Sequence, residues 1–227
     1  CGLSPAEIAR AFLCDVQTID RRLHRGRARL AELGKVAAIP ATDDLATRQP
    51  SVEKALYLLF NEGYQGSDDD NPLHPAMCAD ALRLCELLLV ARGVAAARLH
   101  ALAALFCFHA ARLSTRLDVA GVFVPLAEQD RARWDRALLE RGLIHLGSSS
   151  SGDEMTRWHL EAGIAFEHAS AASVADTRWD VVVRHYDAWM ALAPGPVVAL
   201  NRALALAELR GLDAGRRALA ELASDAK

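Results

Sequence analysis

Apolar residues recur along almost the whole chain at spacings of three and four, which is the period of an α-helix. No run of β-branched residues alternates with polar ones over the length that a sheet strand needs. The pattern therefore predicts an all-α fold. The closest approach to a strand pair is residues 116–126, which we expect to form an extended excursion between helices.

Two polar, glycine-rich segments interrupt this helical pattern. "GKVAAIPATDD" (residues 34–44) is typical of a linker, and "GSSSSGDE" (residues 147–154) is typical of a flexible joint. They predict a small head over residues 1–36, a helical middle domain over 37–150 and a helical tail over 151–227.

The head contains the signals for two short helices. Ser4 is expected to cap a helix over residues 5–12, because Pro5 suits the first helical position and Glu7 completes a capping box. After a tight turn, Asp15 can cap a second helix. The apolar stripe of that helix is predicted to pack against Ile8 and Phe12. The stripe consists of Ile19, Leu23, Leu30 and Leu33.

The opposite face of this second helix carries hydrogen-bond donors. Glutamine and arginine can read the edges of adenine and guanine in the major groove, and further arginines neutralise phosphates. A helix-turn-helix that presents such a face is predicted to bind DNA. The predicted DNA-contacting residues are Gln17, Thr18, Arg21, Arg22, His24, Arg25, Arg27 and Arg29. The alternative is that these arginines only solvate an amphipathic helix.

The charge is divided unevenly along the chain. Residues 1–36 hold seven Lys or Arg and four Asp or Glu, a net charge of +3, and the remaining residues hold 19 and 25, a net charge of −6. A basic head on an acidic body is expected when one module meets nucleic acid and the other does not.

The middle domain is expected to begin with a helix capped by Ser51 and ended by Gly63. Its predicted buried positions are Val52, Leu56, Leu59 and Phe60. Asp68, Asp69 and Asp70 are expected to precede a helix over residues 75–91, because the spacing of a calcium-binding EF-hand is absent there. Residues 94–113 are too polar for a membrane span and predict a buried central helix.

Candidate chemistry is sparse. No HxxxH, HExxH or GxSxG pattern occurs, and the five cysteines lack zinc-site spacing, so we expect no enzyme activity, no metal and no cofactor in a reduced, cytoplasmic protein. Residues 110–135 suggest a salt-bridge network that fastens a loop, or a small-ligand pocket. The candidate regulatory or ligand site is Asn61, Glu62, Tyr64, Arg112, Gln129, Asp130 and Arg131. An enzyme built around Glu62, Asp130 and Arg131 is a rival interpretation.

The tail is expected to form two helix pairs. They cover residues 158–170 with 179–194 and residues 197–211 with 213–223. Small residues permit close helix packing at Ala162, Ala165, Ala203 and Ala207, and Gly211 marks a turn. The pairs are similar to tetratricopeptide repeats, but two units are fewer than the ~3 that an independent solenoid needs, so the tail should pack on the middle domain. Trp179, Tyr186 and Trp189 are expected to fill the core or to anchor a protein partner.

One resemblance links the head to transcription. "LSPAEIARAFLCDVQTIDRRLHRGRARL" resembles the fourth conserved region of bacterial RNA polymerase sigma factors of the extracytoplasmic function (ECF) group. In that family a helix-turn-helix reads the upstream promoter element and touches the polymerase. Asp20 departs from the pattern, because it sets a carboxylate beside the DNA face. The region that melts the promoter is absent from these residues, so we expect a longer protein with an N-terminal portion.

The rest of the chain supports the same resemblance. "YLLFNEGY", "AARLSTRLD", "AEQDRARWD" and "APGPVVALNRALALAE" resemble the helical C-terminal extension of one ECF subgroup. The resemblance implies an ECF sigma factor whose partners are promoter DNA, core RNA polymerase and a regulatory protein bound by the extension, with no membrane contact. A one-component helix-turn-helix regulator with a ligand-sensing helical domain is the alternative.

Overall fold

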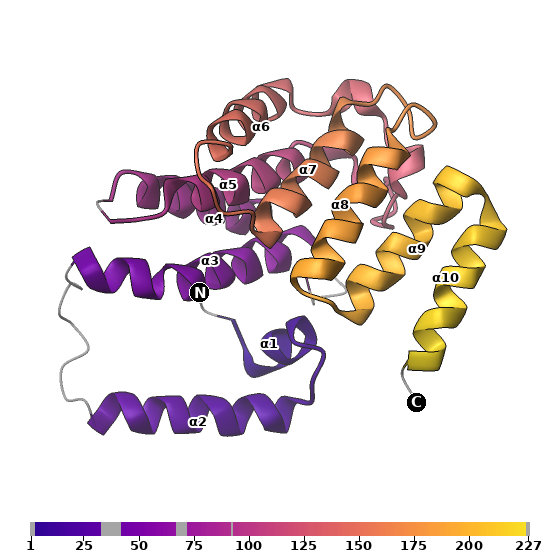
Figure 1. The fold of residues 1–227 in the computed structure, drawn as a ribbon. Coiled ribbons are helices and arrows are strands. Elements are labelled where there is room, and N and C mark those ends of the chain that lie inside the picture. The colour runs from indigo at the N-terminus through magenta and orange to yellow at the C-terminus, as the bar shows by residue number, and fades with distance from the viewer. Residues whose placement is uncertain (1–2, 33–41, 67–71, 92, 226–227) are drawn as a thin grey trace. The chain divides into compact units, whose positions relative to one another are not determined.

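The structure is a computed structural model, and it describes residues 3–32, 42–66, 72–91 and 93–225. These residues form an all-α fold, as predicted, and contain no strand (Figure 1). The α-helices are α1 (Pro5–Ala11), α2 (Val16–Glu32), α3 (Thr42–Tyr64), α4 (Pro75–Leu89), α5 (Ala96–Ala110), α6 (Arg136–Ser149), α7 (Arg157–Ser170), α8 (Trp179–Leu192), α9 (Pro196–Arg210) and α10 (Leu212–Asp225). Three short 3-10 helices lie between α5 and α6: η1 (Leu113–Thr115), η2 (Leu126–Glu128) and η3 (Arg131–Arg133).

The helices belong to two compact units. Unit 1 comprises residues 1–95 and contains α1–α4, and unit 2 comprises residues 96–227 and contains α5–α10. None of the helices within the described ranges is long and apolar enough to cross a membrane.

The helix caps of the head are as predicted. The Ser4 side chain accepts a hydrogen bond from the Glu7 N–H, and the Glu7 carboxylate accepts one from the Ser4 N–H, which completes the capping box. At the start of α2 the Thr18 N–H donates to Asp15 Oδ1 at 2.8 Å. Leu13, between the two helices, has a positive φ of 50° and makes the tight turn.

The apolar stripe of α2 is buried only at its beginning. Ile19 is 3% exposed and Leu23 is half-buried, whereas Leu30 is 48% exposed, so the prediction was wrong for Leu30. Leu33 lies outside the described residues. The reason is length: seven residues make a helix of about 10 Å, which cannot cover the 17-residue α2 of about 25 Å. Phe12 also remains 39% exposed.

Helix α3 begins earlier than the sequence indicated. Residues 42–44 were assigned to the linker, but they form the first turn of α3, and the remainder of the linker is outside the described residues. Ser51 therefore lies inside the helix and is no N-cap, and Val52 is 37% exposed. The buried face passes through Glu53, as well as the expected Leu56, Leu59 and Phe60.

Gly63 does not end α3, because the helix continues to Tyr64. Gly63 allows the start of α4 to approach. A Cβ at this position would lie 2.8 Å from the His74 carbonyl oxygen and 2.9 Å from Cys78 N. The helix predicted over residues 75–91 is α4, and the aspartates at 68–70 lie outside the described residues.

Helix α5 is the centre of unit 2, which confirms the prediction of a buried central helix. Leu99 and all of residues 101–108 are buried between α6 and α7, the two helices that pack most extensively on α5. The extended excursion over residues 116–126 is also confirmed, since Leu117 and Phe123 form an isolated antiparallel bridge.

The joint predicted over residues 147–154 is partly helical. Residues 147–149 complete α6, Ser149 is buried, and the His159 Nε2 lies 3.2 Å from the Ser149 carbonyl oxygen. The prediction of a flexible joint is wrong for these three residues, because α7 holds the end of α6.

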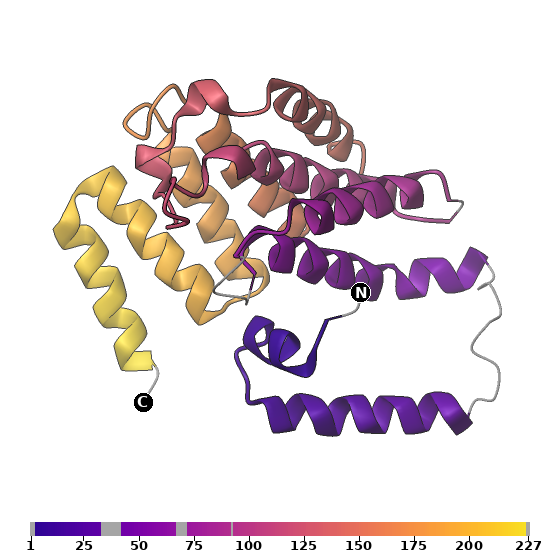
Figure 2. The ribbon, with the colours of Figure 1, turned by 180° about the vertical axis from the view of Figure 1, so that it is seen from behind.

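The tail consists of the two expected helix pairs, α7–α8 and α9–α10. Figures 1 and 2 show the four helices side by side in chain order, and α7 packs on α5. Gly211 has a φ of 90° at the turn between α9 and α10. A Cβ on Gly215 would lie 2.7 Å from the Ala207 Cβ, so small residues do permit the close approach.

Candidate functional site

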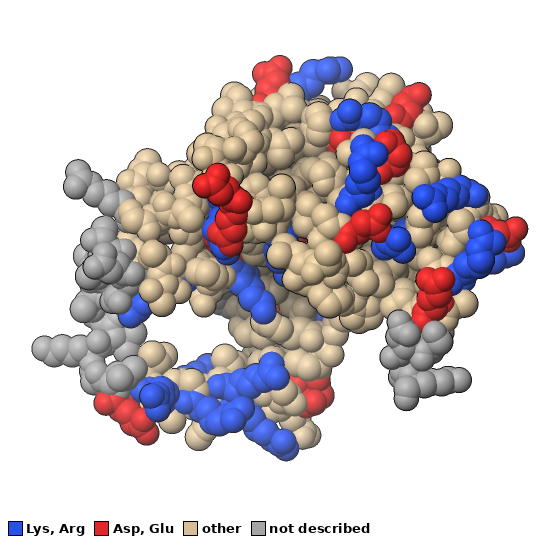
Figure 3. All heavy atoms as spheres, in the orientation of Figure 1, with Lys and Arg blue, Asp and Glu red and all other residues tan. Residues whose placement is uncertain are grey.

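The arginines of α2 form a solvent-exposed basic face. It comprises Arg21, Arg22, Arg25 and Arg29, which lie on one side of the helix, and Arg27, which projects toward the other flank. Gln17 and His24 are also exposed, and one recess is lined by Asp20, Arg21, His24 and Arg25. Figure 3 shows the blue side chains gathered along this helix.

Thr18 differs from the other predicted DNA contacts. Its hydroxyl donates to Asp15 Oδ2 at 2.8 Å, and the two hydrogen bonds from Thr18 lower the pKa of the Asp15 carboxyl. Thr18 is half-buried and its donor is used by the cap. Its structural role is therefore to fix the start of α2, from which the basic face projects.

Three of the predicted regulatory residues line one pocket in unit 1. Asn61, Glu62 and Tyr64, from the end of α3, face Glu7 and Arg10 of α1 across a cavity of about 390 Å³. Tyr64 stacks on Phe60 with ring centroids 5.8 Å apart. A pocket with carboxylates, amides, a guanidinium and aromatic rings can hold a small polar molecule.

The other four predicted residues lie in unit 2, where they fasten the loop between α5 and α6. Arg112 Nε donates to Gln129 Oε1 at 3.2 Å, and Gln129 Nε2 donates to the Val124 carbonyl at 2.9 Å. The Asp130 carboxylate accepts from the Ala132 N–H at 3.0 Å and so starts η3. These contacts hold one loop conformation.

Arg131 links this loop to the end of α7. Its Nη1 donates to the carbonyl oxygens of His168 at 2.5 Å and Ala171 at 2.9 Å, and its guanidinium lies 4.6 Å from the Trp134 ring centroid. The carbonyls at a helix C-terminus lack intrahelical partners, and a cation there also complements the helix dipole. Arg131 thus acts as a cap for α7.

Two histidines beside this loop are neutral in the fold. Burial, with the positive charges of Arg112 and Arg116, lowers the pKa of His109 to about 3. Burial and the charges of Arg112 and Arg131 lower the pKa of His168 to about 4. The cationic surroundings therefore oppose protonation of both rings.

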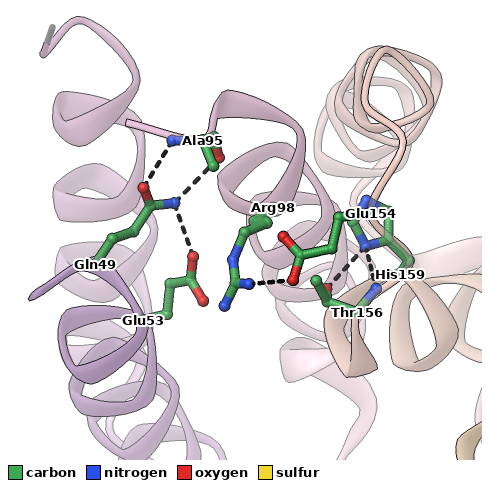
Figure 4. Close-up of polar contacts among 7 residues, drawn as sticks. All are labelled: Gln49, Glu53, Ala95, Arg98, Glu154, Thr156 and His159. Atoms are coloured by element: carbon green, nitrogen blue, oxygen red, sulfur yellow. Dashed lines mark hydrogen bonds and ion pairs between the residues drawn. The ribbon is translucent and has the colours of Figure 1, made fainter. Parts of the chain in front are cut away.

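Sequence reasoning missed a buried polar pair on α3. Gln49 Oε1 accepts from the Ala95 N–H at 2.7 Å, and Gln49 Nε2 donates to the Ala95 carbonyl at 3.1 Å and to Glu53 Oε1 at 2.8 Å (Figure 4). Glu53 is fully buried. The sequence could have indicated this pair, because Gln49 and Glu53 are four residues apart and share a helix face with the predicted buried residues Leu56 and Phe60.

Unit 2 has its own polar contacts at the start of α7. Arg98 Nη1 donates to Glu154 Oε1 at 2.7 Å, and the Thr156 N–H donates to His159 Nδ1 at 3.1 Å (Figure 4). Within the ranges that the structure describes, no three histidine, cysteine or acidic side chains gather as a metal site.

The fold and these surfaces define an all-helical protein with paired C-terminal helices. Residues 48–150 match a family of unknown function, DUF6596. The chain is similar to an uncharacterized protein, R00370, of Rhizobium meliloti (strain 1021), with 34% identity over 213 residues that cover 94% of this chain and 50% of the relative. The chain thus spans about half the length of this curated relative. No solved structure matches it.

Proposed function

We propose that this chain is the C-terminal part of an ECF sigma factor, in which α1 and α2 form a helix-turn-helix that reads the upstream promoter element. The basic face of α2 carries the proposal. Its five arginines are exposed, and they lie on a helix whose first turn is fixed by the Asp15 cap and whose buried side is marked by Ile19.

The arrangement on α2 suits a division of labour. Gln17, Arg21 and His24 follow one another at spacings of four and three, so they share the helix face that lies away from Ile19. Arg22 and Arg29 lie toward the flank of that face, seven residues apart. A helix in the major groove reads bases with its central face and holds phosphates with its flanks.

Substitution of one residue from the central face of α2 and one from its flank tests the DNA interface. Arg21→Ala should remove about 1–3 kcal/mol of discrimination at one base pair, while Arg29→Ala should weaken all sequences nearly equally and reduce the salt dependence. Equilibrium binding of this chain to a promoter library provides both quantities. Uniform effects of both substitutions would show that α2 has been assigned the wrong reading face.

The sigma-factor activity itself requires transcription. The complete gene product, added to core RNA polymerase, should start transcripts from a matching promoter, and Arg21→Ala should reduce that selectivity at the base pair that Arg21 reads. A protein that binds the same DNA but never directs polymerase would instead be a one-component regulator, the second candidate. The pocket of about 390 Å³ beside Glu7 of α1 favours this candidate, because a ligand there would touch the DNA-binding unit.

The helical extension is proposed to contact a protein. Helix α9 carries an exposed apolar stripe at spacings of three and four: Val197 is 53% exposed, Leu200 46% and Leu204 56%. Deletion of residues 151–227 would be a poor test, because α7 packs on the central helix α5. Surface substitutions avoid this difficulty.

Leu200→Glu with Leu204→Glu should reduce promoter-dependent transcription by the complete gene product and leave DNA binding by the head unchanged. Glu208→Lys is the control, since it lies one turn further along α9 and leaves the apolar stripe intact. A rise in transcription with the double variant would mean that the extension inhibits.

A further inference from the structure

The recess on the basic face of α2 contains one carboxylate, that of Asp20. Asp20 lines the recess together with Arg21, His24 and Arg25, and all four side chains are exposed. A carboxylate here repels the phosphates that the arginines attract. Its presence therefore lowers non-specific affinity for nucleic acid and needs another explanation.

The spacing of the arginines leaves the Asp20 carboxylate available. Two other exposed aspartates pair with an arginine three or four residues further along their helices: Asp80 pairs with Arg83 at 3.2 Å, and Asp180 pairs with Arg184 at 2.8 Å. From Asp20 the arginines follow at offsets of one, two and five, and positions three and four are Leu23 and His24. Among the described residues, the Asp20 side chain has no hydrogen bond or ion pair.

The recess therefore presents donors and one acceptor side by side. A guanidinium only donates hydrogen bonds, and an ionised carboxylate only accepts them. In the major groove guanine presents two acceptors, cytosine presents only its N4 amino donor, and adenine presents a donor beside the N7 acceptor. A carboxylate suits cytosine better than adenine, because N7 would face it with a second lone pair.

Resting on the proposed function of α2, we propose that Asp20 is a specificity-determining residue that accepts a hydrogen bond from the N4 amino group of a cytosine next to the guanine contacted by Arg21. The partner is thus a G·C-containing step of duplex DNA. The arginines of the basic face provide affinity for DNA. Asp20 lowers this affinity, most strongly for sequences that lack an amino donor at this position.

The test is a change of base preference. Asp20→Asn replaces the acceptor with an amide that pairs with adenine, so the preferred base at one position should change from cytosine to adenine, and Asp20→Ala should remove the preference there. Selection from a randomised duplex library, followed by equilibrium binding of the chain to the four variants of that position, measures both. We expect about a five- to tenfold loss of discrimination against the wrong base.

Glu32→Gln is the matched control, because it removes one negative charge from the same helix at a distance of twelve residues. It should raise affinity for all sequences alike. If Asp20→Asn does no more than this control, Asp20 acts only through its charge and the proposal is overturned. If the unsubstituted chain binds every duplex equally, and this binding still weakens with salt, then α2 reads no bases and the proposal about Asp20 is wrong. If the unsubstituted chain binds no DNA at all, the proposed function itself is wrong.

Discussion

Arg131 shows how a single side chain acquires its role from residues far along the sequence. The residues on either side of it in "AEQDRARWD" suggested a ligand site, but its guanidinium contacts carbonyl oxygens 37 and 40 residues away. Local caps such as Ser4 and Asp15 could be predicted, because each partner lies three residues distant. Periodicity carries no information about a cap that comes from another element.

We predict that Arg131→Ala lowers the free energy of unfolding of unit 2 by about 1–3 kcal/mol. The substitution removes two hydrogen bonds from a charged donor and leaves the His168 and Ala171 carbonyls without that partner. Thermal or urea unfolding measures the loss. Arg184→Ala is the control, since its ion pair with Asp180 is solvent-exposed and should contribute little to stability. Equal effects of the two substitutions would contradict the capping role.

Among the helices, sequence patterns placed most correctly, and for α3 they predicted the burial of Leu56, Leu59 and Phe60 but wrongly included Val52 and missed Glu53. The expected start at Ser51 would have given a shorter helix, yet α3 includes Pro50 and begins at Thr42. Packing against α4 then selects the face of Glu53 and Leu56, and Val52 lies beside it. Burial of Gln49 is tolerated because its amide bonds both the N–H and the carbonyl of Ala95, and the same amide donates to Oε1 of the buried Glu53. Counting apolar positions along a helix cannot predict that a buried polar side chain will find hydrogen-bond partners.

Two glycines in helices should respond oppositely to substitution by alanine. Gly63→Ala should destabilise unit 1 by roughly 1–3 kcal/mol, because the new Cβ would lie 2.8 Å from the His74 carbonyl oxygen and 2.9 Å from Cys78 N, both backbone atoms. Gly26→Ala in α2 has nothing within 4 Å and should stabilise the helix by about 0.5–1 kcal/mol. Circular dichroism during urea unfolding reports both changes. Stabilisation by Gly63→Ala would mean that α4 can move away at little cost.

The sequence suggested three parts, whereas the structure divides into two compact units with the boundary between Ala95 and Ala96. The residues matched by DUF6596 run from α3 to the end of α6 and so include parts of both units. Gly93, with a φ of 79°, makes a turn just before this boundary, but a single glycine in "GVAAA" does not distinguish a unit boundary from an ordinary turn between two helices. The apolar helix α5 belongs to unit 2 because α6 and α7, which follow it in the chain, bury it. Such tertiary packing could not be read from the sequence around residue 95.

Acid should destabilise unit 2 selectively. The lowered pKa values of His109, about 3, and His168, about 4, mean that the unfolded chain binds more protons than the fold below pH 6.5. Stability is thus complete above about pH 6.5 and falls as the pH drops toward these values, by up to about 1.4 kcal/mol per pH unit for each ring.

All four tryptophans belong to unit 2, so their fluorescence during urea unfolding at pH 7, 6 and 5 reports this unit alone. In His168→Gln the free energy of unfolding of unit 2 should fall less steeply with decreasing pH, because one of the two buried rings is missing. His24→Gln, on exposed α2, should leave this pH dependence unchanged. An unaltered slope in His168→Gln would show that this ring is protonated without opposing the fold.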